Sequence, residues 1–433
     1  MPDAKANKRD FTILFLVMLI TGAGNTALQS VLPTIGRTLH VPDAAIAAAF
    51  SVSAAIWVMS APIWARRSDR DGRREMVLMG VGGFVGSVLL CGIFLMAGLH
   101  GWIGPTVTMV CFIAARILYG IFGAAAPPAA QAMVAMRTSR AGRTKALTML
   151  GSAFGLGTIL GPALAPWLVG LPFVGFAGPA FIFAIGGFVV FVVAFVYLRD
   201  DGPNDIGRGA AISYPSIGGA PAGASIKAAT ADQNSRTLKL TDSRIWPWMV
   251  MGLLMGHAQA MTGQAMGFLI IDRLALPLSL AQPAIGIVLM VGAGAALLVQ
   301  WGIIPLFNLT PRSMVLIGLV VAAIGTGLTA FASSLYAMAT TYAISCIGFG
   351  FTRPGFTAGS SLAVDRSLQG AVAGRVTSVN GAAFILGPSI GIGLYGISQA
   401  LPYFISSAIL VSLVIYVLLM IKPTPPSLDD PDW

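Results

Sequence analysis

The 433-residue chain is 56% apolar and only 10% charged, with a mean hydropathy of +0.83 and a formal net charge of +10. Soluble globular chains average roughly 25% charged residues, so this amount of charge could not cover the surfaces of water-soluble domains. The composition excludes a soluble enzyme, a disordered chain and a collagen-like fibre. It predicts a protein whose solvent is mostly lipid.

Twelve apolar runs in the sequence are long enough to cross a bilayer. A spanning helix needs about 20 mostly apolar residues, because its backbone donors and acceptors must be paired inside the segment. The runs cover residues 11–35, 44–64, 76–99, 105–136, 146–169, 176–198, 246–271, 283–307, 314–332, 336–364, 376–398 and 403–421. We therefore predict an all-α integral membrane fold of twelve transmembrane helices.

The predicted spans fall into two groups of six, separated by one long polar stretch. Residues 199–245 are rich in Gly, Pro, Ala and Ser, and such a segment cannot bury enough apolar surface to fold alone. Short matches repeat across it, since AGR at 141–143 and ILGP at 159–162 recur at 373–375 and 385–388. The sequence thus predicts two pseudo-symmetric six-helix bundles, 1–198 and 246–433, joined by a linker at 199–245.

The basic residues predict the orientation of the chain. All but four of the 26 Lys and Arg residues lie in the spacers on one side of the runs, whereas Arg37 and Arg273 lie on the other and Arg116 and Arg353 lie within runs. The positive-inside rule places both termini in the cytoplasm, so we expect a multi-pass protein of the plasma (inner) membrane. The charges form no stripe that could follow a phosphate backbone, which excludes a nucleic-acid partner.

The loop after the second run carries a recognisable signature. It reads PIWARRSDRDGRR at 62–74 and closely resembles the Gly-x-x-x-Asp-Arg-x-Gly-Arg-Arg loop of the major facilitator superfamily, with Ala65 in place of the leading Gly and Arg67 at a usually apolar position. The matching residues are Asp69, Arg70, Gly72, Arg73 and Arg74. The resemblance implies a conformational latch, in which Asp69 bonds the start of the eleventh span near 376–378 and holds the cytoplasmic side closed.

The fifth run reads GSAFGLGTILGPALAP at 151–166. It is similar to the motif of the exporting, antiporter branch of the superfamily, although Ala165 and Pro166 stand where that motif has a Gly pair. Small residues four apart let helix backbones approach closely in lipid. The predicted helix-bending motif comprises Gly157, Gly161, Pro162, Gly387 and Pro388. Static helix contacts explain these residues equally well.

Polar side chains within the runs are candidates for substrate binding or coupling. A charge at the bilayer centre costs about 2.5 to 3.5 kcal/mol on insertion scales, so such groups usually face a cavity or a partner. The resemblance implies that the first, fourth, seventh and tenth helices line a central cavity. The candidates are Arg116, Arg353, Asn25, Gln29, His257, Gln264, Gln131 and Asp272. Ordinary interior packing is the alternative reading for each of them.

All sixteen acidic residues lie in loops or at span ends. Many exporters of the resembled family use a deep carboxylate for proton coupling, so coupling to protons is left open here, with Asp272 and His257 as the remaining titratable candidates. Two interior arginines and no interior acid predict a cavity of positive potential. The expected substrate is an anionic, zwitterionic or neutral-polar amphipathic molecule rather than a lipophilic cation.

The sequence therefore predicts a secondary active transporter that exports a small amphipathic molecule or metabolite by alternating access. We expect a monomer in the bilayer, without cofactor or metal. Cys91, Cys111 and Cys346 all lie in apolar runs and imply no metal site or disulfide. An importer or uniporter of an organic anion with the same fold is the alternative. A membrane-embedded enzyme is a remote one, because no nucleophile is paired with a base.

Overall fold

The computed structural model describes residues 2–138, 140–200, 239–307, 309–365 and 368–422. Within them the first bundle contains α1 (Pro2–Thr38), α2 (Asp43–Asp71), α3 (Arg73–Leu99), α4 (Pro105–Phe122), α5 (Ala126–Arg137), α6 (Arg140–Val169) and α7 (Gly178–Tyr197). The second contains α9 (Trp246–Leu274), α10 (Leu278–Leu297), α11 (Ile304–Phe307), α12 (Pro311–Thr329), α13 (Leu335–Leu362), α14 (Gln369–Ile397) and α15 (Leu401–Met420).

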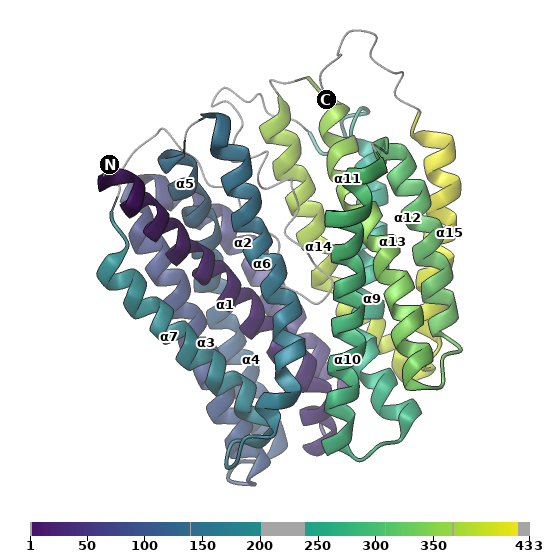
Figure 1. The fold of residues 1–433 in the computed structure, drawn as a ribbon. Helices are drawn as coiled ribbons and strands as arrows, with labels where there is room; N and C mark the ends of the chain where they lie inside the picture. The colour runs from purple at the N-terminus through teal and green to yellow at the C-terminus, as the bar shows by residue number, and fades with distance from the viewer. Residues whose placement is uncertain (1, 139, 201–238, 308, 366–367, 423–433) are drawn as a thin grey trace.

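The predicted all-α membrane fold with two bundles is confirmed (Figure 1). Eleven stretches of helix are long and apolar enough to span a bilayer. The twelfth span is α9, whose 29 residues measure about 44 Å at 1.5 Å per residue, more than the roughly 30 Å hydrocarbon core. Its polar residues, including His257, Gln259, Thr262 and Gln264, lower its mean hydropathy, which explains why it is not among the eleven.

Two predicted spans are interrupted in the structure. The fourth is divided by the short 3-10 helix Gly123–Ala125, because Pro127 and Pro128 have no N–H to bond carbonyls one turn earlier. The eighth ends in the π-helical segment η3 (Leu298–Ile303) before α11. The first span also begins earlier than predicted, since α1 is helical from Pro2 rather than from residue 11.

The two bundles lie closer together at one end of the molecule than at the other. We call the end where α1 begins and α15 ends the terminal face, and the end where α1 ends and α2 begins the distal face. In Figure 1 the terminal face is at the top and the bundles approach one another towards the bottom. Contacts between bundles join α2 to α14, α6 to α10, and α1 to α9 and α10. The positive-inside rule predicts that the terminal face is cytoplasmic.

Glycines allow corresponding helix pairs in the two bundles to pack at backbone distance. A Cβ on Gly157 would lie 2.4 Å from the Leu19 carbonyl oxygen, and one on Gly161 would lie 2.3 Å from that of Ala23, so α6 packs directly on α1. In the second bundle, a Cβ on Gly391 would lie 2.7 Å from the Met261 backbone, where α14 packs on α9. The repeated glycine motif therefore makes the same kind of contact in both bundles.

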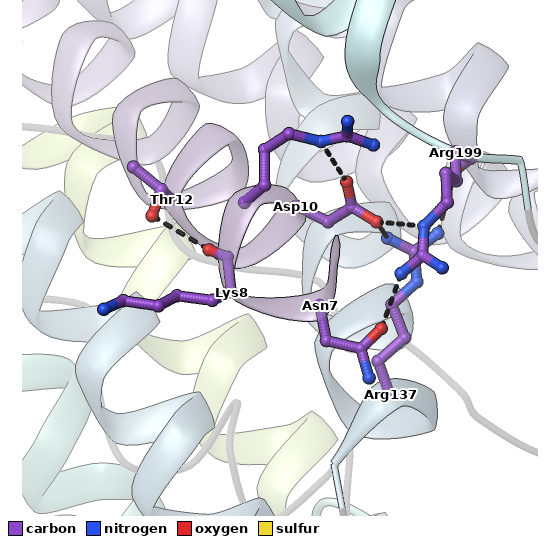
Figure 2. A network of polar contacts seen from close by, with 7 residues as sticks. Asn7, Lys8, Asp10, Thr12, Arg137 and Arg199 are labelled. Atoms are coloured by element: carbon purple, nitrogen blue, oxygen red, sulfur yellow. Dashed lines mark hydrogen bonds and ion pairs between the residues drawn. The ribbon is translucent and has the colours of Figure 1, made fainter. Parts of the chain in front are cut away.

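A buried carboxylate joins three helices at the terminal face of the first bundle (Figure 2). Asp10 on α1 is 0% exposed, and one of its oxygens lies 2.7 Å from Nη1 of Arg137 and 2.7 Å from Nε of Arg199. The other lies 3.5 Å from Nε of Arg9. Arg199 also donates to Oδ1 of Asn7. The end of α5 and the residues that follow α7 are thus held against the start of α1.

We predict that Gly161→Val lowers the free energy of unfolding by about 3 kcal/mol, at the upper end for overpacking, because the added Cβ would overlap α1. The measurement is thermal or denaturant unfolding of the detergent-purified protein. Gly86→Val is the matched control, because a Cβ at Gly86 has no neighbour within 4 Å. Equal stability of the two variants would contradict the backbone-distance packing of α1 on α6.

We also predict that Asp10→Asn destabilises the protein by about 2 to 3 kcal/mol. Loss of one member of a buried ion pair typically costs about 3 to 5 kcal/mol, and partial exposure of Arg199 reduces that figure. Asp365→Asn is the control, since the Asp365 side chain is 84% exposed. The prediction is wrong if both variants unfold at the wild-type denaturant concentration.

Candidate functional site

A cavity of about 260 Å³ lies between the two bundles. One wall comes from α6 of the first bundle and the others come from α9, α10, η3 and α13 of the second. The lining residues are Thr148, Gly151, Ser152, Gly155, Thr158, Ile159, Pro162, Gln259, Leu289, Gly292, Ala293, Ala296, Leu297, Gln300, Trp301, Tyr342, Cys346, Phe349, Gly350 and Arg353. A molecule bound there would contact both bundles.

Arg353 on α13 supplies the charge of this cavity. The residue is 5% exposed, its Nε donates to Oε1 of Gln259 at 2.8 Å, and its guanidinium carbon lies 5.5 Å from the centre of the Phe384 ring. Within the described part of the chain, Nη1 and Nη2 have no hydrogen-bond partner. Both nitrogens are buried in this conformation, and they retain the capacity to donate hydrogen bonds to a carboxylate, phosphate or carbonyl group.

The remaining polar groups of the cavity are uncharged. Thr148, Ser152, Thr158 and Gln300 offer hydroxyl and amide groups, and the lining residues include no Asp or Glu. Arg353 is therefore not neutralised by any lining side chain, and the cavity has a positive potential in a low-dielectric environment. The apolar walls from α10 and α13 complete a site that suits an amphipathic molecule.

Two irregularities of the helices lie in the cavity wall. Gln300 and Trp301 belong to the π-helical η3, a geometry that occurs often at functional sites. Pro354 lies inside α13 and cannot donate to the carbonyl of Gly350 one turn earlier. Gly350 is itself a lining residue, so this proline leaves an extra backbone acceptor at the wall.

Arg116, the other interior arginine, is packed inside the first bundle. It is 0% exposed, and its Nη2 donates to Oδ1 of Asn25 on α1. Its guanidinium carbon lies 4.7 Å from the centre of the Tyr119 ring and 5.2 Å from that of Phe50. The structure thus brings together two of the predicted residues, Arg116 and Asn25, but neither lines the cavity at Arg353.

Four other predicted polar residues also lie away from this cavity. Gln29 on α1 and Gln131 on α5 are buried, at 4% and 3% exposure. His257 is partly exposed, and its Nδ1 lies 2.8 Å from the carbonyl oxygen of Leu253, one turn earlier in α9. Gln264 is also partly exposed. Their roles in binding or coupling remain predictions.

Asp272 lies at the distal face instead of near Arg353. Its carboxylate is 2.9 Å from Nη2 of Arg37 and accepts a 2.8 Å hydrogen bond from the hydroxyl of Tyr395. Arg273, the next residue, donates to the carbonyls of Thr329, Ala330 and Ala332 at the end of α12. The two neighbouring charges therefore belong to different networks.

The predicted motif residues are only partly described. Of the latch, the side chains of Asp69 and Arg70 lie outside the described residues, whereas Arg73 is 1% exposed and Gly72 separates α2 from α3. Gly72 has a φ of +104°, which favours glycine. In the helix-bending motif, Pro162 lines the cavity and α6 and α14 run continuously through Pro162 and Pro388.

Sequence reasoning missed Gln259, which positions Arg353, and the polar lining contributed by α6 and η3. The apolar and polar spacing of α9 singled out His257 and Gln264, whereas Gln259 lies on another face of the same helix. Only the packing of α13 against α9 reveals which face meets Arg353. The unusual Gln-Trp pair at 300–301, at the end of an apolar run, was the one available signal for η3.

Comparisons with known proteins agree with this architecture. The sequence profile described as "Major Facilitator Superfamily" matches residues 14–310. The chain is 33% identical over 157 residues to multidrug resistance protein 1 of Bacillus subtilis (strain 168), covering 36% of this chain and 37% of the relative. It is 32% identical over 199 residues to the class B tetracycline resistance protein of Escherichia coli, covering 43% and 44%. The matches thus span less than half of these curated relatives.

Solved structures share the fold over nearly the whole chain. The human organic anion transporter MFSD10 (TETRAN) superposes with a TM-score of 0.64 at 17% identity, covering 95% of this chain and 99% of that one. A bacterial homolog of the human lysosomal transporter Spinster, in an inward-facing and unoccupied conformation, gives a TM-score of 0.68 at 13% identity, covering 96% and 95%. With its profile match and its two bundles of six spans, the chain belongs to the Major Facilitator Superfamily.

Proposed function

We propose that this protein is a secondary active transporter that exports a small amphipathic molecule by alternating access. Its family supports this proposal, as do the names of its partial relatives, which are multidrug and tetracycline resistance proteins. The observation that carries it is the cavity between the bundles, in which one wall comes from the first bundle and Arg353 comes from the second. Relative movement of the bundles would change access to such a site from one face to the other.

The substrate bears an anionic, zwitterionic or neutral-polar group. Nη1 and Nη2 of Arg353 would donate hydrogen bonds to that group, and Gln259 would hold the guanidinium in place by accepting the 2.8 Å bond from Nε. A cationic compound would instead add a second positive charge to a site whose lining has no acidic residue. The apolar part of the substrate would pack against Leu289, Phe349 and Trp301.

The alternative within the same fold is an importer or uniporter of an organic anion. The residues of the fifth span favour export, because Gly151, Gly155 and Pro162 resemble the antiporter motif and also line the cavity. In this proposal the protein acts as a monomer in the plasma (inner) membrane, with its terminal face in the cytoplasm. The distal face, where the bundles meet, is then external. This arrangement suits an exporter that binds its substrate from the cytoplasm.

We predict that Arg353→Gln weakens binding of a fluorescent anionic amphiphile by about tenfold to a hundredfold. That range corresponds to about 1.5 to 3 kcal/mol for a hydrogen bond to a charged group. Arg353→Lys should retain part of the affinity, because it keeps the charge but not the planar fork. Binding is measured by titration of the detergent-purified protein with the anionic amphiphile and with a cationic dye of similar size.

Lys422→Gln is the control for this experiment, because it removes an exposed positive charge that is not part of the cavity. It should leave both affinities unchanged. Tighter binding of the cationic dye than of the anion, unaltered in Arg353→Gln, would contradict the proposed substrate class.

A second prediction concerns transport. Inverted membrane vesicles containing the protein should accumulate the anionic amphiphile faster than vesicles containing Arg353→Gln, because inversion turns export into uptake. The rates are compared with and without an imposed pH gradient, which also tests coupling to protons. Uptake only by right-side-out vesicles would favour the importer.

A further inference from the structure

At the distal face, one guanidinium is shared between two carboxylates from different bundles. Nη2 of Arg37, in the last turn of α1, lies 2.9 Å from Oδ2 of Asp43 and 2.9 Å from Oδ2 of Asp272. Asp43 begins α2 in the first bundle, whereas Asp272 lies near the end of α9 in the second. Asp272 also accepts a 2.8 Å hydrogen bond from the hydroxyl of Tyr395 on α14. This group, here called the distal ion network, joins the two bundles.

Neutral contacts between the bundles surround the same end. The Thr34 hydroxyl on α1 donates to Oε1 of Gln282 on α10 at 3.1 Å. The hydroxyls of Ser51 on α2 and Ser389 on α14 lie 2.9 Å apart. These contacts position the bundles, but they contain no group that changes charge near neutral pH. The distal ion network is the part of this closure that can respond to protons.

The charge of the network is unbalanced. Two carboxylates share one arginine, so the group has one excess negative charge when both acids are ionised. Among the residues that the structure describes, the neighbouring cation Arg273 does not relieve this excess, because it donates to the carbonyls at the end of α12. The described residues of α10 include no charged side chain. Other titratable groups at this end are Tyr395, Tyr403 at the start of α15, Tyr336 at the start of α13, and the exposed His40 and His100 in the loops after α1 and α3.

The positions of the side chains make the network accessible to protons. The side chains of Arg37, Asp43 and Asp272 are 35%, 22% and 21% exposed. They are thus close enough to solvent to exchange protons, and buried enough to be held in place by their partners. A proton on Asp272 would remove the ionic contact between the bundles while leaving Arg37 paired with Asp43 in its own bundle.

We propose that the Asp43 and Asp272 carboxylates form a proton-binding site that opens the distal face when it is occupied. This inference rests on the proposed transport function and names its coupling ion as H⁺. With both carboxylates ionised, Arg37 ties α1 to α9 and the distal face is closed. Binding of one proton to Asp272 neutralises the excess charge and breaks the ion pair between Arg37 and Asp272, while Arg37 remains paired with Asp43. The population then shifts towards a conformation in which the distal face is open.

The site acts at the mouth of the transport path, more than three helix turns from Gln259, the lining residue that α9 contributes to the cavity. Asp272 and Gln259 are thirteen residues apart on α9, or about 20 Å at 1.5 Å per residue. A proton from the distal side would therefore open that side first, before it reached the substrate. This arrangement explains how a chain without an acid in its cavity lining can still respond to a proton gradient.

The test is a pulsed EPR distance measurement across the distal face of the full-length protein. Labels are attached at Trp102→Cys in the first bundle and Tyr336→Cys in the second, two residues that are 68% and 84% exposed. The native cysteines are first replaced by alanine, namely Cys91, Cys111 and Cys346. Distances are recorded between about pH 8 and about pH 3.5, a range that extends below the ordinary aspartate pKa of about 3.9.

In the wild-type protein, most molecules should show a short distance between the labels at high pH. The fraction of molecules with a longer distance should increase on acidification. Asp272→Asn imitates the protonated acid and should raise the longer-distance population at pH 8 by about threefold to tenfold, as expected for loss of a partly exposed ion pair. It should also remove most of the pH response. Asp43→Asn should reduce the pH response but retain the short distance, because Arg37 then pairs with Asp272 alone.

Two further variants separate this mechanism from loss of folding. Asp272→Glu retains the carboxylate and should retain a pH response, and Glu75→Gln removes an exposed acid near the terminal face without altering the distances. A pH response of wild-type size in Asp272→Asn, or the same loss in Glu75→Gln, would overturn the proposal.

The EPR distance measurement tests the proton site independently of the vesicle transport assay. If the labels respond as expected while no vesicle accumulates substrate, the proton site stands and the proposed export function fails. If export proceeds but the labels do not respond to pH, the export function stands and this coupling site fails.

Discussion

The cost of burying the Arg353 guanidinium is the constraint on which the candidate site depends. An isolated charge in a low-dielectric interior is expensive, and proteins normally pair it with an anion. Here Gln259 provides one neutral acceptor and the Phe384 ring provides a favourable face. The cavity beside the guanidinium leaves room for the anion that would complete the site. A bound anionic group would thus stabilise the arrangement as well as occupy it.

Close packing within each bundle makes it possible for such a site to lie between bundles. Gly157 and Gly161 bring α6 onto α1, and Gly391 brings α14 onto α9, at backbone distance. The ionic contacts of Asp10 add a further constraint at the terminal face of the first bundle. Each bundle is therefore tightly tied internally, whereas the polar contacts between bundles at the distal face are a few hydrogen bonds and one ion network, beside apolar packing of α1 against α9 and α10. Movement between bundles breaks fewer contacts than movement within them.

The two interior arginines illustrate how similar sequence contexts can give different roles. Each is one cation in a long apolar run, and sequence alone assigned both to a cavity. Arg116 is enclosed by Asn25, Tyr119 and Phe50 inside one bundle, so its guanidinium contacts side chains of its own bundle. Arg353 lies at the junction of the bundles. The difference arises from the side chains that neighbouring helices present, and local spacing does not record it.

The sequence by itself determined the solvent, the twelve spans, the two-bundle fold and the family, because hydrocarbon requires long apolar helices and the loop motifs are local. It also marked Arg353 and Asp272 as unusual. Only the tertiary structure decided that Gln259 holds Arg353, that α6 and η3 complete the cavity, and that Arg37 joins Asp272 to Asp43. These contacts link residues far apart in the chain, for example 94 positions for Arg353 and Gln259 and 235 for Arg37 and Asp272. Their formation depends on how helices rotate and pack, which hydrophobic periodicity in an almost wholly apolar chain does not specify.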